Sequence, residues 1–213
     1  MKPFMLINFK TYKKGSGKSS LEVAKACQKV NGKVNMAIAV QAADIYKISK
    51  SVNIPVYAQH IDDIEYGSHT GWLLPEDIKE AGAAGTLLNH SEHRIPHKTI
   101  KKLVDRARKL KLKVIICAKN VSEGATLAKF KPDYIAVEPP ELIGSKTKSV
   151  CTSKPGLIAT CVKKIKAPLL VGAGVKSSQD VKVGMQLGAK GVLLASDVMK
   201  AKNPLKELKE LVQ

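Results

Sequence analysis

Short runs of Val, Ile, Leu and Ala alternate along the whole chain with longer segments in which apolar residues recur at helical spacing. Apolar runs with little polar alternation are typical of parallel strands that are covered on both faces. We predict strands at residues 5–9, 35–40, 55–59, 86–89, 113–117, 134–138, 169–172 and 192–195. A helical pattern follows each of them, at residues 19–30, 43–50, 75–81, 97–110, 122–129, 155–165, 177–187 and 204–212.

Repeated strand–helix units in only 213 residues favour one α/β domain, residues 1–213, folded as a (β/α)8 TIM barrel with parallel strands. No linker-like spacer or solenoid repeat interrupts the alternation. A doubly wound open sheet is the alternative. That fold would usually need fewer strands, and it would not explain why polar residues follow so many of the predicted strands.

The chain is strongly basic, with 36 Lys and Arg against 18 Asp and Glu and a formal net charge of +18. Such a balance raises the question of a nucleic-acid partner. The lysines recur singly or in pairs on predicted helix faces, and aromatic residues make up only 4%. We therefore expect a solvated lysine-rich surface and no nucleic-acid partner. As a hypothesis, the positive field would speed the arrival of a dianionic substrate.

The other compositional features predict a cytoplasmic protein without membrane association. The apolar run near the N-terminus is too short for a signal peptide or a membrane span. The cysteines, at positions 27, 117, 151 and 161, show no C-x-x-C spacing, and we expect free thiols. Cys117 closes an apolar strand pattern, which favours a buried structural role.

Polar residues that can do chemistry follow several of the predicted strands. Glu138 ends the sixth strand, and Pro139-Pro140 then stiffen a loop that reaches Gly144, so we predict a catalytic base beside a lid at residues 139–145. Asn8 and Lys10 share one face of the first strand, and His90 follows the fourth. A carboxylate can remove a carbon-bound proton, and a cation and an imidazole can stabilise the resulting enediolate.

Small residues after the last two strands predict a phosphate site. Gly172-Ala173-Gly174 and Ala195-Ser196 leave backbone N–H groups accessible, and we expect the helix near Ser177 to point its positive end at the same mouth. These features predict a small phosphorylated carbonyl compound as substrate. His90, His93 and His97 resemble a metal cluster, but we expect Pro96 to separate the last two by a turn and predict no metal.

These motifs together resemble the triosephosphate isomerase family, and its compact archaeal-type branch in particular. The resemblance extends over the whole chain and rests on Asn8-Phe9-Lys10, Gln59-His60, Thr70-Gly71, Asn89-His90-Ser91-Glu92, Ala136-Val137-Glu138-Pro139, Ile143-Gly144, Gly172-Ala173-Gly174 and Gly191-Val192-Leu193-Leu194-Ala195-Ser196. It implies interconversion of dihydroxyacetone phosphate and glyceraldehyde 3-phosphate without a cofactor.

The resemblance also implies roles for single residues, in the division of labour established for that family. Glu138 would be the base, His90 the neutral electrophile and Lys10 the cation. The implied substrate-binding residues are Asn8, Phe9, Lys10, Ile143, Gly144, Gly174, Ala195 and Ser196. Glu92 would support the site and Thr70 an interface with a second copy. A homo-oligomer is implied, with a tetramer favoured and a dimer possible.

The sequence departs from the family pattern at three positions. Lys146 stands where the lid motif usually has a second glycine, His93 replaces a common arginine, and Trp72 follows the interface Thr-Gly. Two alternatives remain: another phosphate-binding barrel enzyme, such as an aldolase or a sugar-phosphate isomerase, or a basic nucleic-acid-binding protein. A Schiff-base aldolase would need a lysine inside the strands, and none is predicted there.

Overall fold

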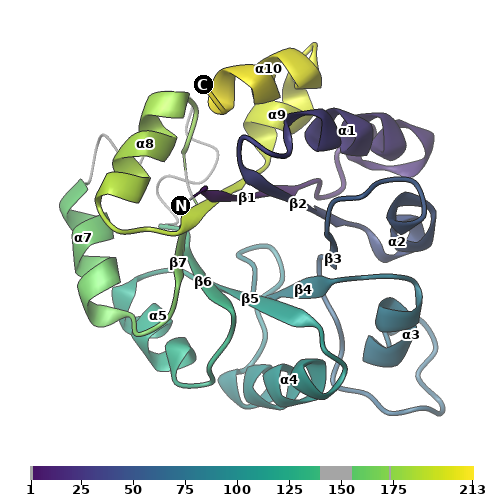
Figure 1. Cartoon of the computed structure of the whole chain (residues 1–213). Coiled ribbons are helices and arrows are strands. Elements are labelled where there is room, and N and C mark those ends of the chain that lie inside the picture. Colours follow the sequence, from purple (N-terminus) through teal and green to yellow (C-terminus); the bar gives the residue numbers. More distant parts are fainter. Residues whose placement is uncertain (1, 140–154, 173) are drawn as a thin grey trace.

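A closed barrel of eight parallel strands forms the centre of the computed structural model, which describes residues 2–139, 155–172 and 174–213 (Figure 1). Each strand pairs with its neighbours in chain order, and β8 closes the barrel against β1. The fold predicted from the sequence is confirmed. The strands are β1 Phe4–Asn8, β2 Asn35–Val40, β3 Val56–Ala58, β4 Gly85–Leu88, β5 Lys113–Ala118, β6 Tyr134–Val137, β7 Leu169–Val171 and β8 Gly191–Leu194.

Helices surround the barrel on its outside (Figure 1). Two of them begin with typical start signals: α3 has a proline in its first turn, and Ser177 and Asp180 form a capping box at the start of α8. The helices are α1 Gly17–Val30, α2 Ala42–Ser49, α3 Pro75–Glu80, α4 His97–Lys109, α5 Val121–Ala128, α7 Pro155–Lys164, α8 Ser178–Gln186, α9 Ser196–Lys200 and α10 Pro204–Leu211.

The alternation of side chains along each strand separates two hydrophobic clusters. Met5, Ile7 and Phe9 belong to the larger cluster, which contains the helix residues that pack on the strands, whereas Leu6 belongs to a smaller one within the barrel. The buried members of the inner cluster are Leu6, Ala37, Ala39, Tyr57, Leu87, Ile115, Cys117, Ala136, Leu170 and Leu193. Asn8 pairs in register with Ala39, so its side chain points inward like that of Leu6.

The structure differs from the sequence prediction mainly at element ends. The first strand ends at Asn8, one residue earlier than predicted, and a short 3-10 helix, Lys13–Gly15, follows. The short helix α9 was also not predicted. Elements of one turn or so are too short to show a hydrophobic period, so pattern reasoning does not detect them. In the part of the chain that the structure describes, no helix is long and apolar enough to cross a membrane.

Candidate active site

Glu138 directly follows β6 and lies buried at the carboxyl end of the barrel. Its backbone N–H donates to the carbonyl of Ala118 at 2.9 Å, which fixes the residue against the end of β5. A Cβ atom on Gly172, which follows β7, would lie 2.5 Å from Cγ of Glu138. The glycine after the seventh strand therefore makes room for the carboxylate side chain, a role that the sequence did not suggest.

The electrostatic surroundings of Glu138 favour its protonated form. Burial raises the pKa of Glu138 to about 7, against the opposing effects of the Cys117 side chain and the Lys10 charge. Among the residues that the structure describes, Oε2 of Glu138 is a buried polar atom without a hydrogen-bond partner. The carboxylate is thus poorly solvated, as a base that must take a proton near neutral pH should be.

His90 faces Glu138 across the mouth of the barrel, with Nε2 at 3.6 Å from Oε1. Burial lowers the pKa of His90 to about 4, and the nearby charge of Lys10 acts in the same direction. Nδ1 of the imidazole accepts a hydrogen bond from the backbone N–H of Glu92 at 3.2 Å. A neutral ring whose Nδ1 accepts must carry its proton on Nε2, so His90 presents a hydrogen-bond donor toward the site.

Lys10 reaches the same mouth, but not by the route that the sequence predicted. The strand has already ended at Asn8, and Lys10 adopts a left-handed backbone conformation with φ of 46°. Its N–H donates to Oδ1 of Asn8 at 3.0 Å, and its carbonyl accepts from Nε2 of Gln59 at 3.0 Å. Nζ forms an ion pair with Oε1 of Glu92 at 2.7 Å. A turn held by these bonds, and not strand alternation, therefore places the cation.

Phe9 is fully buried in the cluster outside the barrel. Its side chain packs next to Gly15, where an added Cβ would lie 2.9 Å from Cβ of Phe9. The ring therefore faces away from the mouth, and the predicted contact of Phe9 with substrate stays a prediction. Its position in the Asn-Phe-Lys motif is explained by packing, because strand alternation turns the middle residue outward.

The predicted phosphate end is described only in part. Ile143, Gly144, Lys146 and most of the predicted lid lie outside the described residues. Gly174 adopts a φ of 66°, and Ala195 is the residue before α9, which begins at Ser196. The expected contribution of α8 stays a prediction, although the carboxylate of Asp180 accepts from the N–H groups of Lys176 and Ser177 at 3.0 and 3.1 Å. Those donors are already occupied within the chain.

A cavity of about 430 Å³ opens beside Lys10 and His90. Its wall also includes His60 and His93, whose rings stack with centroids 4.0 Å apart, and Gly71 from the loop after β3. Thr70 lies exposed in that loop next to Trp72, whose exposed fraction is 59%. The described residues contain no group of three or more side chains suited to a metal ion, although His60 and His93 come together.

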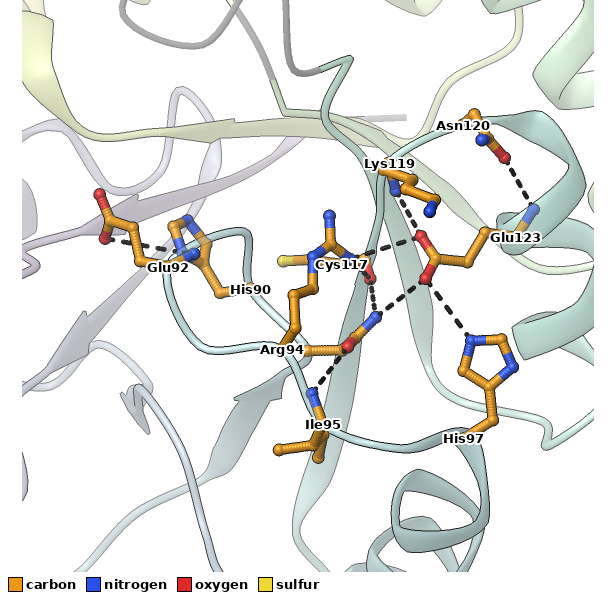
Figure 2. A network of polar contacts seen from close by, with 10 residues as sticks. His90, Glu92, Arg94, Ile95, His97, Cys117, Lys119, Asn120 and Glu123 are labelled. Atoms are coloured by element: carbon orange, nitrogen blue, oxygen red, sulfur yellow. Dashed lines mark hydrogen bonds and ion pairs between the residues drawn. The ribbon is translucent and has the colours of Figure 1, made fainter.

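Cys117, one of three buried free cysteines in the described residues, lies in the inner cluster at the end of β5, which confirms the buried role predicted for it. Sequence reasoning missed a set of polar contacts beside it. Figure 2 shows this set, in which Glu123 of α5 lies between Lys119, Arg94 and His97. The contacts of Glu123 with Arg94 and His97 join residues more than twenty positions apart, and no local pattern reveals such pairs.

A family model described as triosephosphate isomerase matches residues 3–213. The chain belongs to the triosephosphate isomerase family. Triosephosphate isomerase of Methanocaldococcus jannaschii is 43% identical over 216 residues, which cover 98% of each chain. The enzyme of Methanothermus fervidus is 44% identical over 218 residues, covering 99% of this chain and 98% of the other. Both family relatives are archaeal.

The fold of the family is also seen in a solved structure. The crystal structure of triosephosphate isomerase from Bartonella henselae superposes with a TM-score of 0.78 and covers 99% of both chains. Its sequence identity is 20%, so this likeness supports the fold alone. Family membership itself rests on the matching model and on the archaeal relatives, and it agrees with the resemblance drawn from the motifs.

Proposed function

We propose that Glu138, His90 and Lys10 carry out the isomerisation of dihydroxyacetone phosphate and D-glyceraldehyde 3-phosphate. As a member of its family the chain is an intramolecular aldose–ketose isomerase, an activity of glycolysis and gluconeogenesis. The observation that supports these roles best is the buried carboxylate of Glu138, with a pKa near 7, facing the imidazole of a neutral histidine.

The reaction follows from this geometry in proton transfers from and to carbon, with a further transfer between the two substrate oxygens. The carboxylate of Glu138 takes a proton from the hydroxylated carbon next to the carbonyl, which gives an enediolate. The Nε2–H of His90 donates to the carbonyl oxygen as charge develops, and the ammonium of Lys10 stabilises the same charge. The hydroxyl proton then passes from the neighbouring oxygen to the former carbonyl oxygen, relayed by Nε2 of His90, and protonated Glu138 returns its proton to the former carbonyl carbon. No oxidant or cofactor is needed, because the hydrogen only changes carbon atom.

The other site residues take supporting roles in this proposal. Asn8, whose amide side chain holds the Lys10 turn, lines the mouth beside the cation. Glu92 orients Lys10 through their ion pair. We assign the phosphate of the substrate to the backbone around Gly174, Ala195 and Ser196, completed by Ile143 and Gly144 of the lid. Phe9 keeps its predicted place among the substrate-binding residues, with its ring packed outside the barrel.

The assembly state and compartment belong to the same proposal. We infer a homo-oligomer, with a tetramer favoured over a dimer, in which the loop that carries Thr70 reaches a second copy. Trp72 and Tyr66 of this loop are the kind of exposed aromatic side chains that a partner would cover. We place the enzyme in the cytoplasm, without a nucleic-acid or membrane partner.

The aldolase alternative finds no support in the site. A Schiff-base aldolase needs a desolvated lysine, and none of the buried polar or charged side chains in the described residues is a lysine. The lysine nearest the reaction, Lys10, is instead held in an ion pair with Glu92.

The proposed roles are tested by a coupled assay of glyceraldehyde 3-phosphate conversion. Glu138→Gln should reduce kcat by roughly three or more orders of magnitude, the scale of removing an essential catalytic group. Glu80→Gln, on the exposed end of α3, is the matched control and should retain full activity. Activity in the parent with an equally active Glu138→Gln variant would refute the role of Glu138, whereas a folded but inactive parent would refute the reaction itself.

A further inference from the structure

The loop from Asn89 to Pro96 carries His90 and Glu92, and its attachment to β5 and α5 plays no part in the proton transfers described above. Asn89, 2% exposed, follows β4 with a left-handed φ of 59°. Its Nδ2 donates to the carbonyl of Cys117 at 3.0 Å, and its Oδ1 accepts from the backbone N–H of Ile95 at 3.2 Å. One side chain thus joins the start of the loop to its far end and to the neighbouring strand.

Glu123, in the first turn of α5, contacts this loop, the first residue of α4 and the residue after β5 (Figure 2). Its Oε2 accepts from the N–H of Lys119 at 2.7 Å and from Nη1 of Arg94 at 3.4 Å. Its Oε1 lies 3.5 Å from Nδ2 of Asn89 and from Nε2 of His97. Burial opposes its ionisation, but these donors and the Arg94 charge outweigh that effect and lower its pKa, so the carboxylate stays charged.

The strand end that receives these contacts also fixes Glu138. Asn89 and Arg94 both donate to the carbonyl of Cys117, and the next carbonyl, that of Ala118, accepts the N–H of Glu138. His90 is the immediate neighbour of Asn89 in the chain. The end of β5 therefore helps to position both His90 and Glu138, whose Nε2 and Oε1 atoms lie 3.6 Å apart.

We propose that Asn89 and Glu123 are positioning residues for the isomerisation, which hold the imidazole of His90 in register with the carboxylate of Glu138. This inference rests on the roles assigned to His90 and Glu138. An asparagine meets both demands of the position, because it tolerates positive φ and carries a donor and an acceptor. Glycine would meet only the first demand. Aspartate would set a carboxylate oxygen against the Cys117 carbonyl and Glu123.

The sharpest test is Asn89→Gly, since glycine accepts the same backbone conformation and only the side-chain bonds are lost. Lys131→Gly is the matched control: Lys131 has a φ of 58° and precedes β6, at the other end of the barrel. We expect Asn89→Gly to lower kcat on the order of 10- to 100-fold, the scale of misplacing a reacting group by about 1 Å, with a much smaller change in KM. The control should match the parent.

A second readout separates positioning from a loss of stability. Nitrogen-15 NMR of the imidazoles in the folded protein reports the pKa of His90 directly. If the contacts of Asn89 and Glu123 keep His90 buried, Asn89→Gly should raise the pKa of His90 from about 4 toward the ordinary 6.5, because the loosened loop admits water. A merely structural asparagine would lower the unfolding midpoint and leave that pKa unchanged in the folded protein.

Normal kcat together with an unchanged His90 titration in folded Asn89→Gly would overturn the proposal. If that variant does not fold, Glu123→Gln takes its place, as it keeps the side-chain volume and loses the charge that holds Arg94. It should give the same two changes at smaller size, and parent-like values in both would equally overturn the proposal. An inactive parent would refute the assigned reaction. The pKa of His90 in parent and variant, measured by NMR, would still decide whether Asn89 and Glu123 hold His90 in place.

Discussion

Removing the charge of Glu138 should make the protein more stable while it abolishes turnover. The folded-state pKa of about 7 lies above the ordinary value of 4.5, so the folded protein binds a proton more tightly than the unfolded chain between these values. The favourable contribution of the protonated form is complete below pH 4.5 and is lost as the pH rises through 7. At about 1.4 kcal/mol per pKa unit, burial of the ionised carboxylate costs roughly 3 kcal/mol.

Glu138→Gln replaces this carboxylate by a neutral group of the same shape, so the size of the effect depends on pH. At pH 8 nearly all of the roughly 3 kcal/mol penalty is present in the parent, whereas at pH 5 less than about 1 kcal/mol remains. The free energy of unfolding of the variant should therefore exceed that of the parent by about 2 to 3 kcal/mol more at pH 8 than at pH 5. Every other titrating group is shared, so its contribution cancels in this comparison.

Urea unfolding of both proteins at the two pH values, at equal protein concentration, measures this difference. For a domain of this size the gain at pH 8 corresponds to a rise in Tm of about 5 to 10 °C. Equal concentration matters because any oligomer is stabilised by mass action. A difference between variant and parent that is the same at pH 5 and pH 8 would refute the raised pKa, and with it the desolvated base.

Three further outcomes follow from the same site. Because only ionised Glu138 can take a proton, kcat/KM measured by the coupled assay should fall below pH 7 by about tenfold per pH unit, and a flat profile down to pH 5 would contradict this. His90→Gln should lower kcat on the order of 100- to 1000-fold, as removal of an oxyanion donor does, while stopped-flow binding of a substrate analogue changes little. Since the chain carries a net charge of +18, added NaCl should lower kcat/KM for the dianionic substrate, and sucrose of equal viscosity serves as the control.

Much of the fold was predictable because the evidence for it is local. Each unit shows its own apolar run and helical period, and the parallel barrel follows from the number of such units in a short chain. The short helix α9 and the 3-10 helix Lys13–Gly15 were missed because neither is long enough to show a period. The end of β1 was misplaced for a related reason, since the turn at Lys10 depends on a left-handed conformation that lysine rarely adopts.

The candidate site was predictable only where residues end strands. Parallel strands deliver their carboxyl ends to one face, so His90 and Glu138 could be brought together from spacing alone. The contacts that hold His90 and Glu138 in place could not be predicted in this way. Glu123 meets Asn89 from 34 positions away, and Cys117 meets it from 28, through atoms that the sequence pattern does not distinguish.

Residues in the left-handed conformation occur both at the misplaced end of β1 and among the site contacts that were not predicted. In the part that the structure describes, four residues other than glycine have positive φ: Lys10, Asn89, Lys111 and Lys131. Lys111 lies between α4 and β5, and Lys131 lies between α5 and β6. In the corresponding positions after α1, α3 and α8 the chain has glycines with positive φ. Lys10 and Asn89 instead follow β1 and β4 at the opposite end. Glycine there would relieve backbone strain of about 1 kcal/mol or more each. It would also delete the ammonium that pairs with Glu92 and the amide that binds Cys117, so at these two positions the side chain is the reason that the strain persists.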